Sequence, residues 1–394
     1  MKGAQRVIVY LFVTCVAVFL GYSADLSRRA VSQPAGRVFA MENARGTLLS
    51  KTALFLLLVT LFIPAALRQA TGNDYMRYVE IYHLAAVGAR VPTEEGFNLF
   101  VRAVYALCGY ENYLLVFALF SLATTALFLL AIRRQARFFG FSIYLFMMFG
   151  YYFQSYNTVR YYLALAAAFY ALYYFLEKEY VPFVLIILLA STFHKSVLIV
   201  LLLYPVASLA WKKWHAAAAL LLGGSLLMFH EQWLALMLRF YPLWDDTEDL
   251  AASGGFSYGN IVKCALVLAL AAGIRYIAAG KEPGGSFYDR KVLFGLKCTA
   301  MALWIYLFGS FIPEVSRICY YLTIPQVLLL PELLECIPES RLKLKKLLTA
   351  LVAAAALASF AMFLRKADDS RIRILPYKTF LFHELPGTPS RSIE

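Results

Sequence analysis

The sequence predicts an all-α, polytopic membrane protein with about twelve transmembrane helices. Of its 394 residues, 61% are hydrophobic, and the mean hydropathy is +0.66. The apolar residues form repeated continuous runs, each close to the length of about 20 residues that a helix needs to cross a bilayer. We therefore expect one integral membrane domain over residues 1–364 and a C-terminal tail over residues 365–394.

The predicted spans follow one another along the whole membrane domain. The first run has no small-residue cleavage site before Arg28 and Arg29, so we expect it to be retained rather than removed as a signal peptide. The runs lie at residues 7–22, 52–67, 113–132, 138–153, 159–176, 181–193, 197–211, 216–229, 261–279, 292–311, 318–334 and 347–364.

Two long polar loops interrupt this pattern. The loop over residues 68–112 contains a short amphipathic stretch, 97–108, with Arg102 inside it. Such a stretch is more typical of a re-entrant or interfacial helix than of a span. The second loop, residues 230–260, carries the acidic run WDDTED.

The distribution of Lys and Arg predicts the orientation. Basic residues concentrate in alternate loops, for example at 133–137 and 341–346, and the positive-inside rule makes these loops cytoplasmic. Both termini and both long polar loops then face outward. The net charge of +13 fits cytoplasmic loops beside anionic lipid headgroups, and we expect no nucleic-acid partner.

No motif for a metal or a nucleotide stands out in the sequence. The six cysteines are scattered without the paired spacing that zinc sites use, and Asp245 and Asp246 are adjacent rather than spaced as a metal-binding Asp-x-Asp pair. A glycine-rich phosphate loop is also missing from the sequence. We therefore expect neither a metal nor another cofactor.

Four of the candidate site residues lie in one stretch, residues 151–196. Asn157 and Arg160 stand at the start of one apolar run, and His194 and Lys195 stand at the end of the next. The short polar break at 177–179 lets the two helices fold back, which brings both pairs to one membrane face. Arginine binds phosphate through forked donors, and histidine transfers protons near neutral pH. Two structural alternatives stay open: the arginine reaches lipid headgroups, and the His-Lys pair only ends a helix.

Further polar residues fall on the same predicted outer face. Gly72 and Asn73 introduce a turn followed by Asp74, Tyr75, Arg77 and Tyr78. Aromatic rings with a carboxylate are typical of sugar-binding clefts, although an aromatic belt at the membrane interface explains most tyrosines equally well. The other candidates are Glu95, Phe97, Arg317, Tyr320 and Tyr321.

Together these segments resemble the EpsG family of bacterial exopolysaccharide-biosynthesis membrane proteins, which are similar to Wzy-type polysaccharide polymerases. The segments are GNDYMRY, EEGF, NTVRYYLA, LASTFHKSVLIVLLLYP, RICYYLTIP and LPYKTF, and the resemblance extends from about Leu54 to Phe380. Two positions depart from the family pattern. The family commonly has Gln where this chain has Tyr161, and an acid that the family places near Arg317 is here Glu314.

The resemblance implies a fold similar to type C glycosyltransferase-like polymerases and an inner-membrane enzyme that faces the periplasm. The implied substrate is an oligosaccharide repeat unit on undecaprenyl diphosphate, with membrane lipid, a flippase and a chain-length regulator as partners. A leaving diphosphate needs cations, and an attacking hydroxyl needs a base, for which Asp74, Glu95 and His194 are candidates. We assign catalytic roles to Asp74, Arg160, His194 and Arg317. We assign substrate binding to Tyr75, Arg77, Tyr78, Glu95, Phe97, Asn157, Lys195, Tyr320 and Tyr321.

The hypothesis is a metal-independent, inverting glycosyl transfer from a growing lipid-linked chain to a new repeat unit. Three alternatives remain open. A lipid-linked oligosaccharide flippase would distribute its charges along a path through the membrane. A membrane O-acetyltransferase would also use a histidine, and a ligase would share the same half-reaction.

Overall fold

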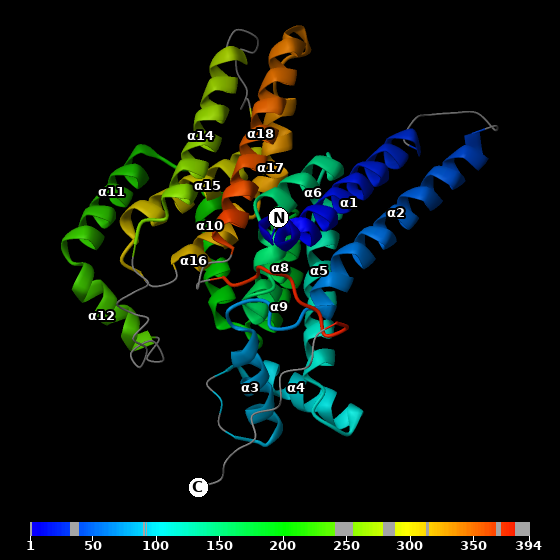
Figure 1. The fold of residues 1–394 in the computed structure, drawn as a ribbon. Helices are drawn as coiled ribbons and strands as arrows, with labels where there is room; N and C mark the ends of the chain where they lie inside the picture. The colour runs from blue at the N-terminus through cyan, green and yellow to red at the C-terminus, as the bar shows by residue number, and fades with distance from the viewer. Residues whose placement is uncertain are drawn as a thin grey trace. The chain divides into compact units, whose positions relative to one another are not determined.

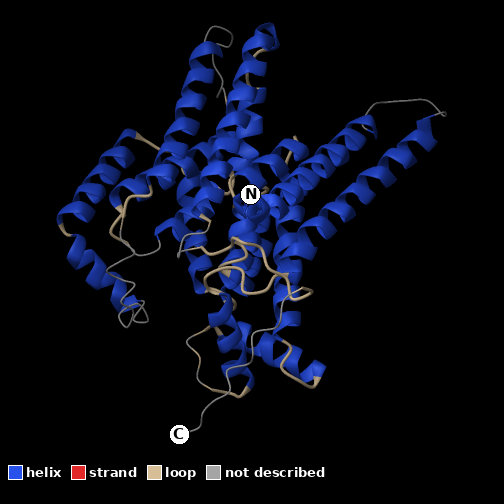
Figure 2. Ribbon diagram, viewed as in Figure 1, coloured by secondary structure: helices blue, strands red, loops and turns tan. Residues whose placement is uncertain are grey.

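The computed structural model describes residues 2–31, 39–89, 91, 93–240, 255–278, 288–312, 315–367 and 372–382. Every regular element in these ranges is helical, which confirms the all-α prediction, and one isolated β-bridge joins Arg68 to Thr379 (Figures 1 and 2). The α-helices are α1 (Lys2–Val31), α2 (Phe39–Leu67), α3 (Tyr75–Ala86), α4 (Glu95–Cys108), α5 (Tyr113–Gln135), α6 (Phe139–Met148), α7 (Tyr151–Gln154), α8 (Val159–Leu176), α9 (Tyr180–Ser191), α10 (Val200–Ser208), α11 (Lys213–Met228), α12 (His230–Phe240), α14 (Tyr258–Ala278), α15 (Arg290–Phe308), α16 (Val315–Thr323), α17 (Gln326–Glu335) and α18 (Leu342–Lys366). Two 3-10 helices are η1 (Lys195–Ile199) and η3 (Glu339–Arg341).

Seven of the described helices are long and apolar enough to cross a membrane, which confirms a polytopic membrane protein. An eighth span results if α11 and α12, which meet at 92°, are counted as one broken span. The seven helical segments are Val7–Leu26, Gly46–Leu67, Tyr113–Gln135, Val159–Leu176, Tyr258–Ile277, Arg290–Phe308 and Glu339–Lys366. Each of them contains or overlaps one of the predicted runs.

The remaining predicted spans take shorter forms. The runs at 138–153, 181–193 and 197–211 become helices of 10–17 residues: Phe139–Met148, Tyr180–Ser191 and Lys195–Ser208. The run at 318–334 divides into α16 and α17, with Pro325 capping the second helix. These lengths are below what a straight span needs, so the count of twelve stays a prediction.

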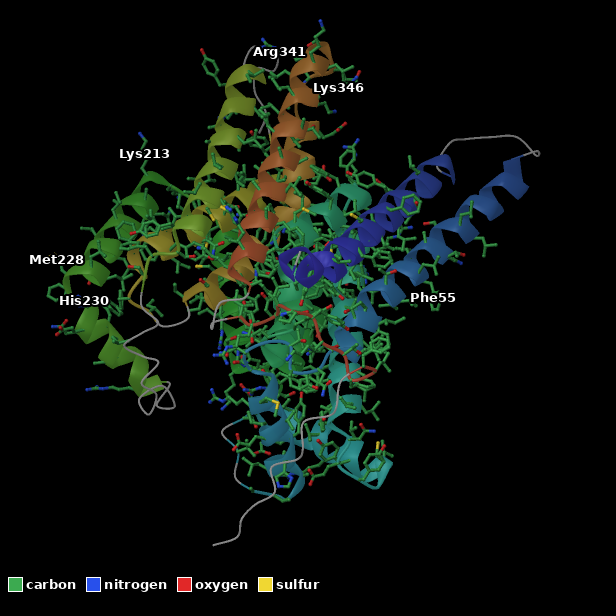
Figure 3. All side chains as sticks on the ribbon, in the orientation of Figure 1. Phe55, Lys213, Met228, His230, Arg341 and Lys346 are labelled. Atoms are coloured by element: carbon green, nitrogen blue, oxygen red, sulfur yellow. The ribbon has the colours of Figure 1, made fainter. Side chains whose placement is uncertain are left out.

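Exposed apolar side chains cover the candidate spans. Phe55 on α2 is 63% exposed and Met228 at the end of α11 is 77% exposed, and both are labelled in Figure 3. In water such surface would be unfavourable, whereas a lipid-facing helix carries it without cost. Lys213, Arg341 and Lys346, also labelled in Figure 3, are exposed at the start of α11, at the end of η3 and near the start of α18; the predicted orientation of these segments stays a prediction.

The described chain forms two compact units, and each is described by itself. The first comprises residues 1–173, 188–195 and 347–394, and the second comprises residues 174–187 and 196–346. In the first unit α1 packs against α2 and α6, and α2 packs against α5. A Cβ on Gly140 would lie 2.8 Å from the Cα of Tyr22, so only glycine permits this approach of α6 to α1.

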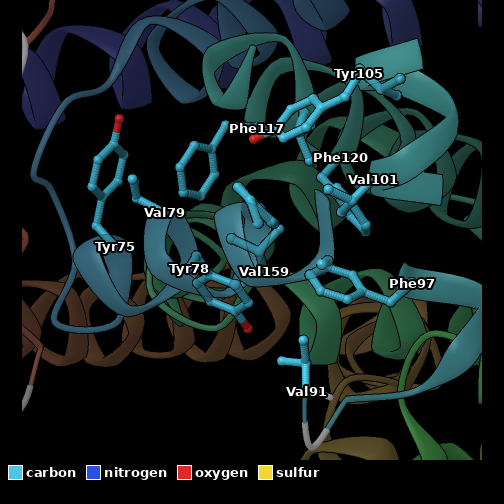
Figure 4. Close-up of a cluster of buried hydrophobic side chains, with 14 residues drawn as sticks. Tyr75, Tyr78, Val79, Val91, Phe97, Val101, Tyr105, Phe117, Phe120 and Val159 are labelled. Atoms are coloured by element: carbon cyan, nitrogen blue, oxygen red, sulfur yellow. The ribbon is translucent and has the colours of Figure 1, made fainter. Parts of the chain in front are cut away.

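The polar loop over residues 68–112 folds into α3 and α4, which pack on each other and, through α4, on α5. Their shared core is aromatic (Figure 4). Tyr75 stacks on Phe117 with ring centroids 4.5 Å apart, and Tyr82 meets Phe117 edge-on at 5.1 Å. This core holds α3 and α4 against the N-terminal end of α5.

The amphipathic stretch predicted at 97–108 corresponds to α4, which starts two residues earlier. Phe97 and Val101 are fully buried, while Leu99 and Leu107 on other faces are 68% and 89% exposed. The helix ends at Gly109, whose φ of 76° suits glycine. That α4 is a re-entrant or interfacial helix stays a prediction.

The second unit is built around α15, which packs against α14, α16, α17 and α10. Inside it the Tyr204 hydroxyl donates to the carbonyl of Tyr321 at 3.2 Å. The prediction of a single membrane domain over 1–364 with a separate tail stays a prediction.

Candidate active site

A buried carboxylate, Glu94, is the hub of the polar cluster in the first unit. Its Oε2 accepts a hydrogen bond from Nη1 of Arg160 and forms an ion pair with it. The Glu94 side chain is 9% exposed and that of Arg160 is 17% exposed. Charge-assisted bonds of this kind are stronger than neutral ones, so Arg160 is firmly held in this state.

The second oxygen of Glu94 faces the turn that follows α9. Oε1 accepts a hydrogen bond from the backbone N–H of Lys195 at 2.9 Å and lies 3.5 Å from Nδ1 of His194. One carboxylate therefore connects Arg160, at the start of α8, with His194 and Lys195, at the start of η1. The predicted fold-back of residues 151–196 is confirmed in this respect.

Close packing places Glu94 at this position. Glu94 occupies the N-cap position of α4, and the next residues contact the turn after α9: the Phe97 N–H donates to the carbonyl of Thr192 at 3.2 Å. A Cβ on Gly96 would lie 2.4 Å from Thr192 Oγ1 and 2.8 Å from the Thr192 carbonyl oxygen. Only a glycine allows α4 to begin there.

Electrostatics keep Glu94 ionised. Burial by itself raises the pKa of a carboxyl group, but hydrogen bonding to His194, the charge of Arg160 and the N–H of Lys195 together lower it. The net effect takes the pKa of Glu94 from 4.5 to about 2. Such a weak base is a counter-ion at neutral pH rather than a proton acceptor.

Aromatic rings enclose the arginine from the other side. The guanidinium carbon of Arg160 lies 5.1 Å from the ring centroid of Phe97 and 6.0 Å from that of Tyr78. The Tyr78 hydroxyl also accepts from the backbone N–H of Arg160 at 3.5 Å. Tyr161, the residue after Arg160, meets the His194 ring edge-on at 5.7 Å.

Asp74 and Asn157 are linked through the backbone. The side-chain oxygen of Asn157 accepts from the N–H of Asp74 at 3.0 Å. Because Asn157 precedes α8 by two residues and Asp74 immediately precedes α3, this bond joins the start of α3 to the start of α8. Tyr78 on α3 in turn contacts Arg160, so both predicted groups belong to one end of the first unit.

The other predicted residues of this unit fall into two groups. Tyr75, Tyr78 and Phe97 are 1%, 5% and 0% exposed, and their rings pack in the aromatic core (Figure 4). Arg77, Glu95 and Lys195 have exposed side chains. A role for any of them in substrate binding stays a prediction, and the three rings would have to become accessible to stack on a sugar.

Three predicted residues lie in the second unit. The Tyr321 hydroxyl is 3.0 Å from Ser196 Oγ, whereas the side chains of Arg317 and Tyr320 are partly exposed. Glu314, Asp245 and Asp246 lie outside the described residues. Within the described ranges no three His, Cys, Asp or Glu side chains cluster as a metal site would, which leaves a metal-independent reaction as a prediction.

The predicted site does not include Glu94. It includes the neighbouring Glu95, since two adjacent acids at a helix start look alike in a sequence. The extended backbone at Glu94 and the helical backbone at Glu95 send their side chains in different directions, so one is buried and the other exposed. The proximity of Gly96 was the only local signal of close packing there.

Comparison with known proteins gives one result. A sequence model described as the EpsG family matches residues 51–379, which is most of the chain. No curated protein and no solved structure matches.

Proposed function

The chain belongs to the EpsG family, and on that basis we propose that it polymerises oligosaccharide repeat units carried on undecaprenyl diphosphate, at the outer face of the bacterial cytoplasmic membrane. Family membership supports a polymerase-type function in exopolysaccharide biosynthesis. The substrate, the membrane and the orientation are the proposal.

The observation that carries the proposal is the Glu94–Arg160–His194 cluster. Arg160 is a cation at a helix start that pairs with the Glu94 carboxylate, and among the described residues no group accepts a hydrogen bond from its buried Nε. A diphosphate offers the same kind of bidentate acceptor with more charge. Arg160 can therefore pass from Glu94 to a lipid-linked diphosphate without leaving its place.

The proposed reaction needs one base and one cation centre. The hydroxyl oxygen of the acceptor repeat attacks the anomeric carbon of the donor sugar, and the bond from that carbon to the diphosphate oxygen breaks. Arg160 stabilises the negative charge that develops on the leaving diphosphate. The hydroxyl proton moves to a base, and the lipid diphosphate departs.

His194 and Asp74 are the candidates for that base. The low pKa of Glu94 makes the carboxylate unsuitable, but Glu94 directs Nδ1 of His194 toward itself, which places Nε2 on the opposite edge of the ring. Asp74 is fixed through Asn157 at the same end of the unit. Arg317 in the second unit is a further candidate cation.

The test uses a bacterial strain that lacks the chromosomal gene and is supplied with the wild-type chain, Arg160→Ala or the control Arg137→Ala. Arg137 is an exposed arginine two residues after the C-terminal end of α5, whereas Phe117, near the N-terminal end of α5, packs in the aromatic core with Tyr78 and Phe97. Lipid-linked glycans are extracted and sized by gel electrophoresis and mass spectrometry. We expect Arg160→Ala to accumulate single repeats at the outer leaflet while Arg137→Ala makes full-length polymer.

Other outcomes identify the alternatives. Repeats trapped at the inner leaflet would indicate a flippase. Full-length polymer that lacks only acetyl groups would indicate an acetyltransferase. Lipid-linked polymer that is not passed to its final acceptor would indicate a ligase.

A further inference from the structure

The C-terminal segment 372–380, called here the strap, pairs with the loop that precedes Asp74. The N–H of Gln69 donates to the carbonyl of Lys378 at 2.9 Å, and the N–H of Phe380 donates to that of Leu67 at 3.4 Å. These bonds flank the antiparallel bridge between Arg68 and Thr379. The two segments are about 300 residues apart in sequence but form one backbone ladder in the first unit.

The pairing continues up to the candidate site. The N–H of Gly72 donates to the carbonyl of Arg373 at 3.0 Å, and the N–H of Asn73 donates to that of Ile372 at 3.0 Å. The next N–H, that of Asp74, donates to Asn157 at 3.0 Å. The backbone N–H groups of Gly72, Asn73 and Asp74 are thus all hydrogen-bonded, the first two of them to the strap.

The strap is itself well anchored. Ile374 is fully buried, its N–H donates to the carbonyl of Ala367 at 3.1 Å, and its own carbonyl accepts from the Tyr10 hydroxyl. The Tyr377 hydroxyl donates to the carbonyl of Pro64 at 2.9 Å. The strap therefore bonds to the end of α2 and to α1 as well as to the loop.

On the side away from the strap, the loop that precedes Asp74 is closely packed against the turn before α8. Gly72 has a φ of +103°, and a Cβ on it would lie 2.8 Å from the Tyr156 carbonyl oxygen and 3.1 Å from the Cα of Asn157. The loop is held between the strap and the turn that leads into α8. Displacing either side moves Asp74.

We infer that the strap is a positioning element of the active site, which sets the place of Asp74 relative to Asn157 and the start of α8. This inference rests on the proposed function. A misplacement of about 1 Å in a catalytic group can cost about 100-fold in rate. The strap therefore contributes to turnover although none of its side chains needs to touch the substrate.

The first test compares two truncations of the full chain, assayed as purified protein with a lipid-linked repeat unit. One ends at Phe382 and keeps the strap, and the other ends at Ala367 and removes it. We expect the first to keep wild-type turnover and the second to lose about 100-fold in kcat, with KM unchanged within about threefold because Arg160 and Glu94 remain. Equal turnover of the two truncated chains, or a loss confined to KM, would overturn the inference.

A second variant covers the case in which the shorter chain does not fold. Asn73→Cys and Ile372→Cys are introduced together in a background with Cys15, Cys108 and Cys336 replaced by Ser, and are joined by a short bifunctional thiol reagent. We expect efficient cross-linking and full activity of the cross-linked protein, because the strap stays seated during turnover. Failure to cross-link, or activity that is lost only on cross-linking, contradicts a seated strap.

Failure of the inference and failure of the proposed function are distinguishable. If Arg160→Ala abolishes polymer formation while the chain ending at Ala367 is fully active, only the strap inference fails. If Arg160→Ala makes normal polymer, the proposed function fails, whereas the cross-linking result still reports on the strap.

Discussion

Two arginines of the first unit, Arg68 fully buried and Arg160 partly buried, are held in opposite ways. Arg160 is paired with Glu94 and sits near His194. Arg68, which is 1% exposed, has no carboxylate within ion-pairing distance among the described residues. Its Nη1 donates to the carbonyl of Ala65 and, at 2.9 Å, to Ser121 Oγ. Its guanidinium carbon lies 5.0 Å from the Phe117 ring and 5.2 Å from the Tyr156 ring.

The difference in partners distinguishes an arginine that only stabilises the fold from one that can bind a ligand. The carbonyl groups and aromatic rings around Arg68 are parts of the fold, and a ligand cannot replace them. Arg68 is therefore a structural residue at the start of the 68–74 loop. A carboxylate partner can be replaced by another anion. Arg160, more accessible than Arg68 and paired with a carboxylate that another anion can replace, is the arginine suited to a ligand.

The largest expected effect comes from breaking the exchangeable pair. Arg160→Met leaves the Glu94 carboxylate buried without its main counter-charge, which should lower the free energy of unfolding by about 3–5 kcal/mol. Glu94→Leu added to it should restore most of that loss, since the pair is then replaced by apolar groups. Polymer formation should be absent in both.

The measurement is unfolding in detergent micelles, with Arg137→Met as the matched control. A double variant that is no more stable than Arg160→Met would show that the ion pair does not account for the loss.

The next effect is a pH dependence specific to Glu94. Because the pKa of Glu94 is lowered to about 2 from 4.5, its ionised form stabilises the fold above about pH 4.5, and this stabilisation is lost as the pH falls toward 2. The loss should be at most about 3 kcal/mol. Unfolding of the wild-type chain and of Glu94→Gln, followed over pH 2–7, should show the difference between them shrinking on acidification. A difference that stays constant would contradict the prediction.

A smaller effect is expected from Gly96→Ala, which tests whether packing holds Glu94 near Arg160. The new methyl group would press on Thr192, so α4 must shift away from the turn after α9. Overpacking of this kind costs about 1–3 kcal/mol. We expect lower polymer yield together with a higher pKa of Glu94, read from the same pH series. The control is Gly273→Ala, where nothing lies within 4 Å of the added Cβ, and it should behave as wild type.

The smallest effect is expected from Arg68→Met. Its removal leaves no buried anion behind, and the Ala65 carbonyl keeps a donor in Ser121 at 3.3 Å. The substitution removes the free-energy cost of burying a charge without a counter-ion, and this gain offsets the contacts that are lost. The free energy of unfolding should therefore change by about 1 kcal/mol or less. A loss as large as that of Arg160→Met would remove the distinction between the two arginines.

Much of the fold follows from composition and hydrophobic runs. Seven of the predicted runs correspond to helices long enough to span a membrane. The shorter segments differ because turns and 3-10 geometry divide them, as at η1, which replaces the expected start of a span after His194. Apolar length predicts that a segment avoids water, but not whether it continues as one helix.

The site was predicted in part. The fold-back of residues 151–196 follows from the polar break between two apolar runs, and it does bring Arg160 and His194 to one carboxylate. That this carboxylate is Glu94 rather than Glu95 depends on which of two neighbours turns inward, and a sequence does not contain that information.

By itself, then, the sequence determined that the chain is a helical membrane protein with its unusual polar residues at the ends of apolar runs, because the cost of burying charge in lipid confines such residues there. Only the tertiary structure decided which acid neutralises Arg160, that Tyr75, Tyr78 and Phe97 are buried in an aromatic core, and that the strap pairs with the loop before Asp74. These are contacts between distant segments. Their energies depend on distance and burial, which exist only once the chain has folded.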